Sequence, residues 1–296
     1  AFFLFGLAMF VYLLNQFGTG QVGWNFERAG WSILGAMLVW FIIYLANTAS
    51  WKLVLGTEGE SVGFFHLLMV NISGFSIDTI TPVIALGGEP YKVKVLSGVM
   101  GTREAFSAVV LFRMIHTVGH MLILLTGILG GLVFLTLPAA LNWTLVAGGV
   151  IMGVVLGVVI SGFREGVFRR IENFAGRFRL LRRVSTLLQK HEHDLHEMDR
   201  IVTDAYRRRP GKFYSAVFLE YFCRICMGIE VYFVLHGIGS DISLISALFI
   251  YVLYSVVINL IFFIPLNFGV REGSLYLGLQ SLALVPALGL YLGVII

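Results

Sequence analysis

The sequence predicts an all-α membrane protein, a polytopic helical bundle of about eight segments in which proline and glycine break two helices. Of the 296 residues, 58% are hydrophobic and only 13% are charged, whereas about a quarter of a soluble domain is charged. Several apolar runs reach the roughly 20 residues that cross a bilayer. These runs do not alternate polar and apolar residues, which argues against membrane strands. We expect a single transmembrane domain over residues 1–296.

Eight segments are predicted to enter the membrane, at 1–14, 30–47, 64–86, 104–136, 141–162, 213–235, 244–264 and 274–295. The first begins inside an apolar run and the last ends inside one, so we expect the natural protein to extend beyond both ends. Trp31, Trp51 and Trp143 lie near predicted span ends, where indole rings favour the membrane interface.

The segment from 163 to 212 differs from the rest because it holds most of the arginines. The short connections at 137–143 and 236–243 contain no lysine or arginine, so the positive-inside rule places the arginine-rich loop in the cytoplasm, under a prokaryotic inner membrane. Apolar residues between Val184 and Ala205 recur at three- and four-residue spacing, which predicts an amphipathic helix on the inner leaflet or beneath the bundle. The arginines either bind anionic lipid or act as ordinary topological anchors.

Two stretches interrupt the apolar runs in the same way, from Pro82 to Glu89 and from Pro265 to Glu272, with the glutamate seven residues after the proline in each. Proline removes a backbone donor and glycine permits non-helical angles, so each helix must unwind there. A pair of such breaks, one in each half of a chain, points to a transporter's binding site. The helix-breaking residues are Pro82, Gly87, Gly88, Pro265 and Gly269. We interpret the stretches as an internal repeat, parallel if both segments span and inverted if one is re-entrant, and we favour re-entrant helices.

Ionisable side chains inside the predicted spans are candidates for function, because each costs about 2.5–3.5 kcal/mol at the centre of a membrane helix. The residues expected to bind substrate are Asp78, Glu89, Arg113, His116, His120, Arg271 and Glu272. A secondary group comprises Glu220, Arg224 and Glu230. Glu220 and Arg224 are four residues apart, which favours an intrahelical ion pair, and Glu230 has no obvious local partner unless it approaches the outer surface.

The chemistry of these side chains fits a charged headgroup. Arg113, His116 and His120 share a helical face, and a guanidinium binds phosphate or carboxylate in a bidentate manner, although Arg113 could instead pair with an internal carboxylate. The helix starts after the breaks offer backbone donors to an anion, unless the two break glutamates, Glu89 and Glu272, cap those starts themselves.

Three further patterns favour ordinary packing over chemistry. Cys223 and Cys226 are interpreted as small packing residues. The histidine- and acid-rich run at 191–196 is interpreted as a solvated helix face, so neither a metal nor another cofactor is expected. Glycines at 149, 153 and 157 allow close helix packing, within the chain or in a homodimer.

The two breaks also resemble a known family. Gly87-Gly88-Glu89-Pro90-Tyr91-Lys92 is similar to the central region of the lysylphosphatidylglycerol synthase/flippase transmembrane family, and Pro265 to Leu275 resembles its late P-x-GGLGVREG signature. The resemblance, which covers nearly the whole chain, implies a lipid translocator with paired re-entrant segments around a central cavity lined by Glu89, Arg113, Arg271 and Glu272. Asn267 and Phe268 stand where the family has glycines, and residues 1–296 resemble the flippase half of the family.

The leading interpretation is a flippase-like lipid translocase that moves a phosphate-bearing or aminoacylated headgroup, with a membrane lipid as substrate and no nucleic-acid partner. No Walker-type glycine loop is present, so transfer would run downhill or be coupled to protons through Asp78, Glu89 or Glu272. The alternatives are an integral membrane transferase acting on a lipid carrier, and an accessory subunit of a lipid synthase.

Overall fold

The computed structural model describes residues 11, 30–55, 61–80, 88–166, 170, 192–261, 267 and 269–296. Its elements are helices: α3 (Trp31–Val54), α4 (Phe64–Ile80), α5 (Gly88–Met100), α6 (Thr102–Phe134), α7 (Ala139–Glu165), α10 (Glu192–Arg208), α11 (Pro210–Gly237), α12 (Leu244–Leu260), α13 (Val270–Ser281) and α14 (Leu288–Ile295). Pro82, Gly87 and Pro265 lie outside the described residues, as does most of the arginine-rich segment.

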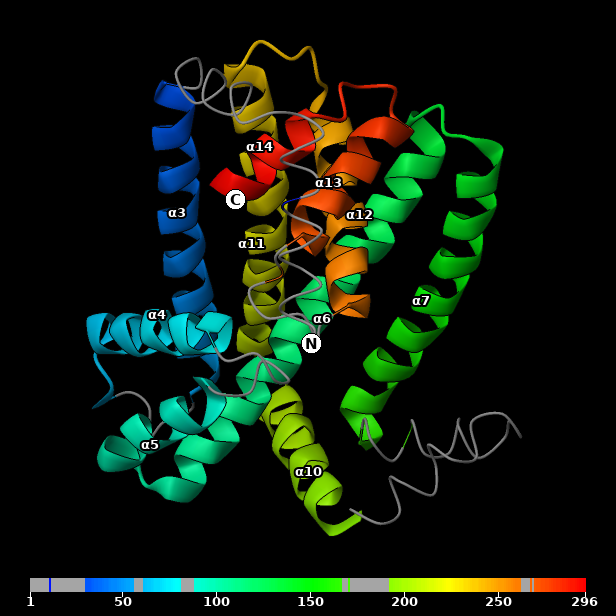
Figure 1. The fold of residues 1–296 in the computed structure, drawn as a ribbon. Coiled ribbons are helices and arrows are strands. Elements are labelled where there is room, and N and C mark those ends of the chain that lie inside the picture. The colour runs from blue at the N-terminus through cyan, green and yellow to red at the C-terminus, as the bar shows by residue number, and fades with distance from the viewer. Residues whose placement is uncertain are drawn as a thin grey trace.

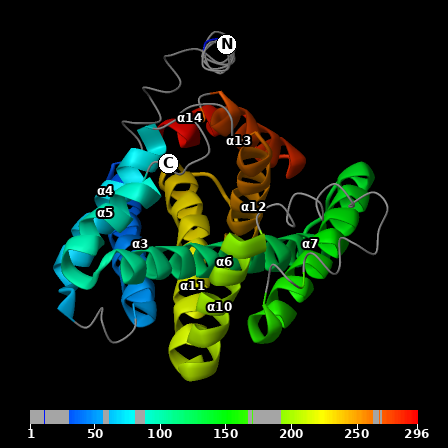
Figure 2. The same cartoon turned by 90° about the horizontal axis from the view of Figure 1, so that it is seen from below.

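The bundle is built from upright helices crossed by one long tilted helix. Within the described residues, three helices are long and apolar enough to cross a membrane, at Trp31–Val54, Thr102–Phe134 and Ala139–Phe163, and Leu244–Leu260 is a shorter apolar helix. This all-helical, multi-pass architecture confirms the coarse fold class. Helix α6 has 33 residues, about 50 Å at 1.5 Å per residue, and runs diagonally from α5 to the far side beside α7 (Figures 1 and 2).

Helices α4 and α5 lie at one end of the bundle, where α4 runs across the foot of α3 (Figure 1). Helix α10 lies at the same end, below α11, inside the segment for which an amphipathic helix was predicted. The first break therefore connects two helices at this end, and α5 leads directly into the diagonal α6.

The expected single span at 274–295 is wrong. The structure has two helices there, α13 and α14, joined by a turn in which Ala283 takes a φ of 55°. Pro286 lies in this turn, two residues before α14, and a proline inside an apolar run breaks the ladder of helical hydrogen bonds. Helix α14 packs back against α13 and makes Tyr291 and Leu292 fully buried.

The helices meet in several hydrophobic clusters, and glycines bring their backbones together. The largest cluster joins α6, α11, α12, α13 and α14 through residues such as Phe249, Ile250 and Leu275. On α6, a Cβ added to Gly119 would lie 2.6 Å from the Cβ of Glu220 on α11. Absence of that Cβ allows the two helices to cross at close range.

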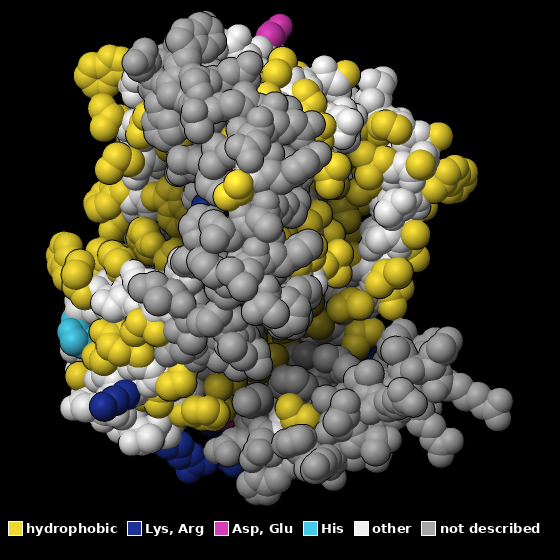
Figure 3. Space-filling view, in the orientation of Figure 1, with side chains coloured by type: hydrophobic (Ala, Val, Ile, Leu, Met, Phe, Trp, Pro, Cys, Tyr) yellow, Lys and Arg dark blue, Asp and Glu magenta, His cyan; other side chains and the backbone are white. Residues whose placement is uncertain are grey.

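The outer surface is apolar along the upright helices, as lipid contact requires. Trp31 and Trp143 are strongly exposed, as expected of interfacial indoles, but Trp51 is fully buried and stacks on Phe112. The interfacial expectation for Trp51 is wrong because α4, α5 and α6 pack over that end of α3 and enclose the ring in a cluster. Lysine and arginine side chains on the face drawn in Figure 3 gather mainly at the end where α5 lies.

Candidate functional site

A buried histidine links an acid and a base at the crossing of α6 and α11. Nδ1 of His116 lies 2.8 Å from Oε2 of Glu220, and the guanidinium of Arg224 contacts Nε2 of the same ring. A guanidinium can only donate, so Nε2 accepts and the ring proton resides on Nδ1, from which it is donated to the carboxylate. Glu220 is 0% exposed and Arg224 is 8% exposed. The described ion pairs do not include the direct Glu220–Arg224 contact that the sequence predicted, because His116 stands between the two.

Asparagines extend this network from α11 to α3 and α4. The amide of Asn47 on α3 donates to Oε1 of Glu220 at 2.7 Å. The amide of Asn71 on α4 in turn donates to Oδ1 of Asn47 at 2.6 Å and to the hydroxyl of Thr48 at 3.2 Å. Both carboxylate oxygens of Glu220 are thus hydrogen-bonded, which is the condition for burying such a group at tolerable cost.

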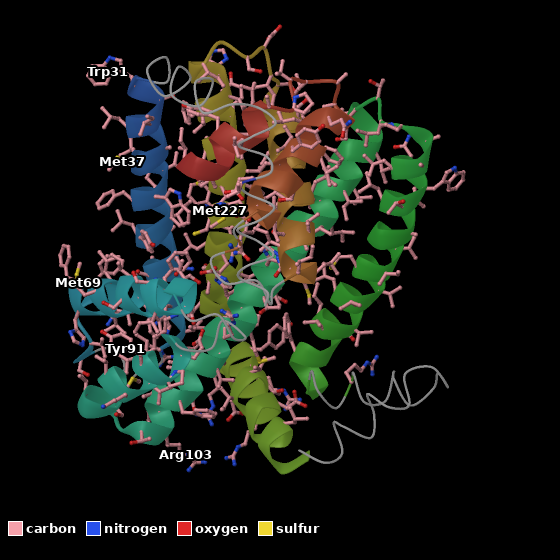
Figure 4. The ribbon with its side chains drawn as sticks, in the orientation of Figure 1. Trp31, Met37, Met69, Tyr91, Arg103 and Met227 are labelled. Atoms are coloured by element: carbon pink, nitrogen blue, oxygen red, sulfur yellow. The ribbon has the colours of Figure 1, made fainter. Side chains whose placement is uncertain are left out.

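The network continues towards α12 through a thioether. Nη1 of Arg224 lies 3.5 Å from Sδ of Met227, and the hydroxyl of Tyr251 donates to the same sulfur at 3.1 Å. Met227 projects from the middle of α11 (Figure 4). We call the set Asn71, Asn47, Glu220, His116, Arg224, Met227 and Tyr251 the polar chain; it connects α4, α3, α11, α6 and α12.

The helix that follows the first break is held by Asp78. Its Oδ1 accepts a hydrogen bond of 2.9 Å from the backbone N–H of Gly88, which opens α5. A Cβ on Gly88 would collide with the carbonyl oxygen of Gly74 on α4, so glycine is required for this close approach. The sequence left open that Glu89 caps this helix start, whereas in the structure Asp78 makes the contact.

Glu89 instead faces two basic side chains. Its Oε1 lies 3.5 Å from Nη1 of Arg113 on α6 and 3.9 Å from Nζ of Lys92. Arg113 retains 43% exposure of its side chain, while Lys92 is buried with its ammonium over the rings of Trp51 and Phe112. Arg113 is therefore both tethered to the first break and open to a ligand.

The second break repeats the helix-capping arrangement. Oε2 of Glu272 accepts a hydrogen bond of 2.8 Å from the backbone N–H of Gly269, and Oε1 lies 3.6 Å from Nε of Arg271. Glu272 is 1% exposed because Gly293 of α14 packs against its side chain. Glu272 thus caps its own helix, the alternative that the sequence left open.

His120 belongs to the second half of the site. Its Nε2 lies 3.1 Å from the amide nitrogen of Asn259 and 3.3 Å from the hydroxyl of Ser255, both on α12. Because the asparagine amide donates, Nε2 is the acceptor and Nδ1 carries the proton. One turn apart on α6, the two histidines face different partners.

Glu230 lies further along α11 and is 1% exposed, so its side chain is enclosed by the protein. Oε1 accepts a hydrogen bond of 2.9 Å from the indole N–H of Trp40 on α3. Sequence reasoning did not single out Trp40, Asn47, Met227 or Tyr251; only the polarity of Asn47 inside an apolar run could have drawn attention. No group of three metal-binding side chains occurs in the described part of the chain.

Comparison with known proteins identifies the family. The model of the lysylphosphatidylglycerol synthase transmembrane region matches residues 1–296. The chain belongs to this family. A UPF0104 membrane protein of Methanothermobacter thermautotrophicus is 24% identical over 255 residues, covering 81% of this chain and 72% of the relative. No solved structure matches the chain. In this member of the lysylphosphatidylglycerol synthase transmembrane-region family, the polar chain links α4, which precedes the first break in sequence, to α12, which precedes the second.

Proposed function

We propose that this protein is a flippase-like lipid translocase that moves a phosphate-bearing or aminoacylated headgroup between leaflets. The observation that carries the proposal is the polar chain, which places a carboxylate, an imidazole and a guanidinium inside an apolar bundle. A headgroup entering hydrocarbon loses hydration worth several kcal/mol, and a path of polar side chains replaces those hydrogen bonds. Membership of a lipid-linked membrane family supports the same conclusion.

The two breaks form the ends of this path in the proposal. In each, a carboxylate accepts the N–H that opens the following helix, from Gly88 to Asp78 and from Gly269 to Glu272. This correspondence supports an internal repeat with paired re-entrant segments, α4–α5 and α12–α13. Arg113 at the first break and Arg271 at the second supply a guanidinium to a phosphate on either side.

Replacing Arg113 by alanine is expected to slow lipid transfer about tenfold or more. A hydrogen bond to a charged group contributes about 1.5–3 kcal/mol, and 1.4 kcal/mol corresponds to a factor of ten. The measurement is leaflet accessibility of an acyl-labelled phosphatidylglycerol in proteoliposomes. Arg271→Ala is expected to behave likewise, whereas Glu272 is a poorer test because its loss also uncaps α13.

Arg103→Ala is the matched control, since Arg103 is exposed at the start of α6 away from the polar chain. Transfer by the control should equal that of the wild type. A wild-type rate no faster than protein-free vesicles would reject the translocase, and a wild-type rate in Arg113→Ala would reject Arg113 as a headgroup ligand.

A further inference from the structure

Glu230 is a buried carboxylate that lacks a basic partner among the described residues. Trp40 satisfies Oε1, but Oε2 is buried without a hydrogen-bond partner among the described residues. A buried acceptor left in this state costs about 1–3 kcal/mol, and more when charged. Neither the polar chain nor the capping of the two breaks uses Glu230. A ligand that donates a hydrogen bond to Oε2 would account for a buried carboxylate at this position of α11.

Aromatic rings surround the approach to Glu230. Trp40 lies 5.7 Å from Tyr44 and 5.9 Å from Phe75 between ring centroids, and Tyr44 lies 5.9 Å from Phe75. Trp40 and Tyr44 are half-buried, and Phe75 is 43% exposed. The cluster therefore extends from the buried carboxylate to the surface of the protein. Aromatic faces attract ammonium groups, with Trp the strongest.

We propose that Glu230, with the rings of Trp40, Tyr44 and Phe75, forms a binding subsite for an ammonium group, carried by a lipid headgroup or by a free amine. Oε2 accepts hydrogen bonds from the ammonium while Trp40 holds Oε1. As a headgroup subsite it rests on the proposed translocase and names amine-bearing phospholipids as its substrate class.

The test is binding of short-chain phosphatidylethanolamine and phosphatidylglycerol to the detergent-purified full chain, followed by native mass spectrometry. Glu230→Gln is expected to weaken phosphatidylethanolamine binding at least tenfold and to leave phosphatidylglycerol binding unchanged. Glutamine keeps the shape of a protonated carboxyl, so equal ethanolamine-lipid binding by the variant and the wild type would overturn the proposal. Glu104→Gln, partly exposed at the start of α6, is the matched control.

A second variant keeps the test decisive if Glu230→Gln does not fold. Tyr44→Leu removes one aromatic face and is expected to weaken binding of the ethanolamine lipid about threefold to tenfold, from a cation–π contribution of about 0.5–2 kcal/mol. Its affinity for phosphatidylglycerol should not change. An equal loss for both lipids, or no loss for either, would contradict an ammonium subsite.

Free ethanolamine distinguishes the two sources of the amine. Competition by millimolar ethanolamine supports a site for the amine itself, and binding of the lipid without such competition supports a site that needs the whole headgroup. The binding measurement does not require lipid transfer. If the protein binds the ethanolamine lipid selectively through Glu230 but does not transfer lipid between leaflets, only the translocase proposal is rejected. Transfer of ethanolamine lipid unaffected by Glu230→Gln would reject the subsite alone.

Discussion

At the scale of single residues, the site depends on one missing methyl group. Gly119 lies between His116 and His120 on α6 and allows the backbone of Glu220 to approach, with its carbonyl carbon 3.0 Å from a Cβ that glycine does not have. Without that approach, His116 would not reach the carboxylate on α11. Gly119 therefore permits this helix crossing although it has no side chain that could bind a ligand.

Gly119→Ala is expected to destabilise the protein by about 1–3 kcal/mol, the usual cost of overpacking a tight contact. Thermal unfolding in detergent measures the change. Gly130→Ala on the same helix is the control, because nothing lies within 4 Å of its added Cβ; alanine should stabilise that position by up to about 1 kcal/mol. Equal melting temperatures for the two variants would show that α6 and α11 are further apart than described.

At the scale of secondary structure, the helices after the breaks begin where carboxylates hold their first N–H groups. Asp78 and Glu272 perform this role for α5 and α13. The two carboxylates differ in their sequence position: Asp78 lies ten residues before the start of its helix, whereas Glu272 lies inside its own helix. Capping thus joins α4 to α5 by a tertiary contact, whereas α13 is capped locally.

Asp78→Ala is expected to loosen the start of α5, because loss of a capping oxygen costs about 1 kcal/mol. The backbone amide of Gly88 should then exchange its hydrogen about fivefold faster, as measured by hydrogen–deuterium exchange. Thr79→Ala is the control, since the Thr79 hydroxyl donates to Phe75 within α4. Unchanged exchange at Gly88 in Asp78→Ala would argue that the cap does not form.

At the scale of the whole molecule, the basic side chains on the face drawn in Figure 3 gather at one end of the bundle. Arg103 lies at the end of the protein that carries α5 and α10 (Figure 4), and the connection between α11 and α12 lies at the opposite end (Figure 1). From the positive-inside rule we predict that the first end faces the cytoplasm.

Cysteine labelling in intact cells tests this orientation. Asp241→Cys, in the connection between α11 and α12, should react with a membrane-impermeant reagent from outside, and Arg103→Cys only after permeabilisation; both positions are exposed. Cys223 and Cys226 are buried and should contribute little background. The reverse labelling pattern would invert the proposed topology.

Sequence patterns predicted the features that depend on local composition. Long apolar runs without alternation indicated helices in a membrane, and the residues of the two breaks indicated the family that the comparison confirms. The single span expected at 274–295 missed a local signal, Pro286, whereas two other errors occurred where distant segments decide the outcome. Trp51 is buried because other helices cover it, and His116 separates Glu220 from Arg224 because α6 crosses α11 at that level.

The sequence by itself determined that this chain forms apolar membrane helices, which of its polar groups enter them, and where two helices must break, because hydrophobicity and backbone restrictions act within a few residues. Only the tertiary structure decided which polar groups meet: Asn47 with Glu220, Asp78 with Gly88, and Trp40 with Glu230. Hydrogen bonds act over about 3 Å, and side chains on different helices come within that distance only when the helices pack and cross.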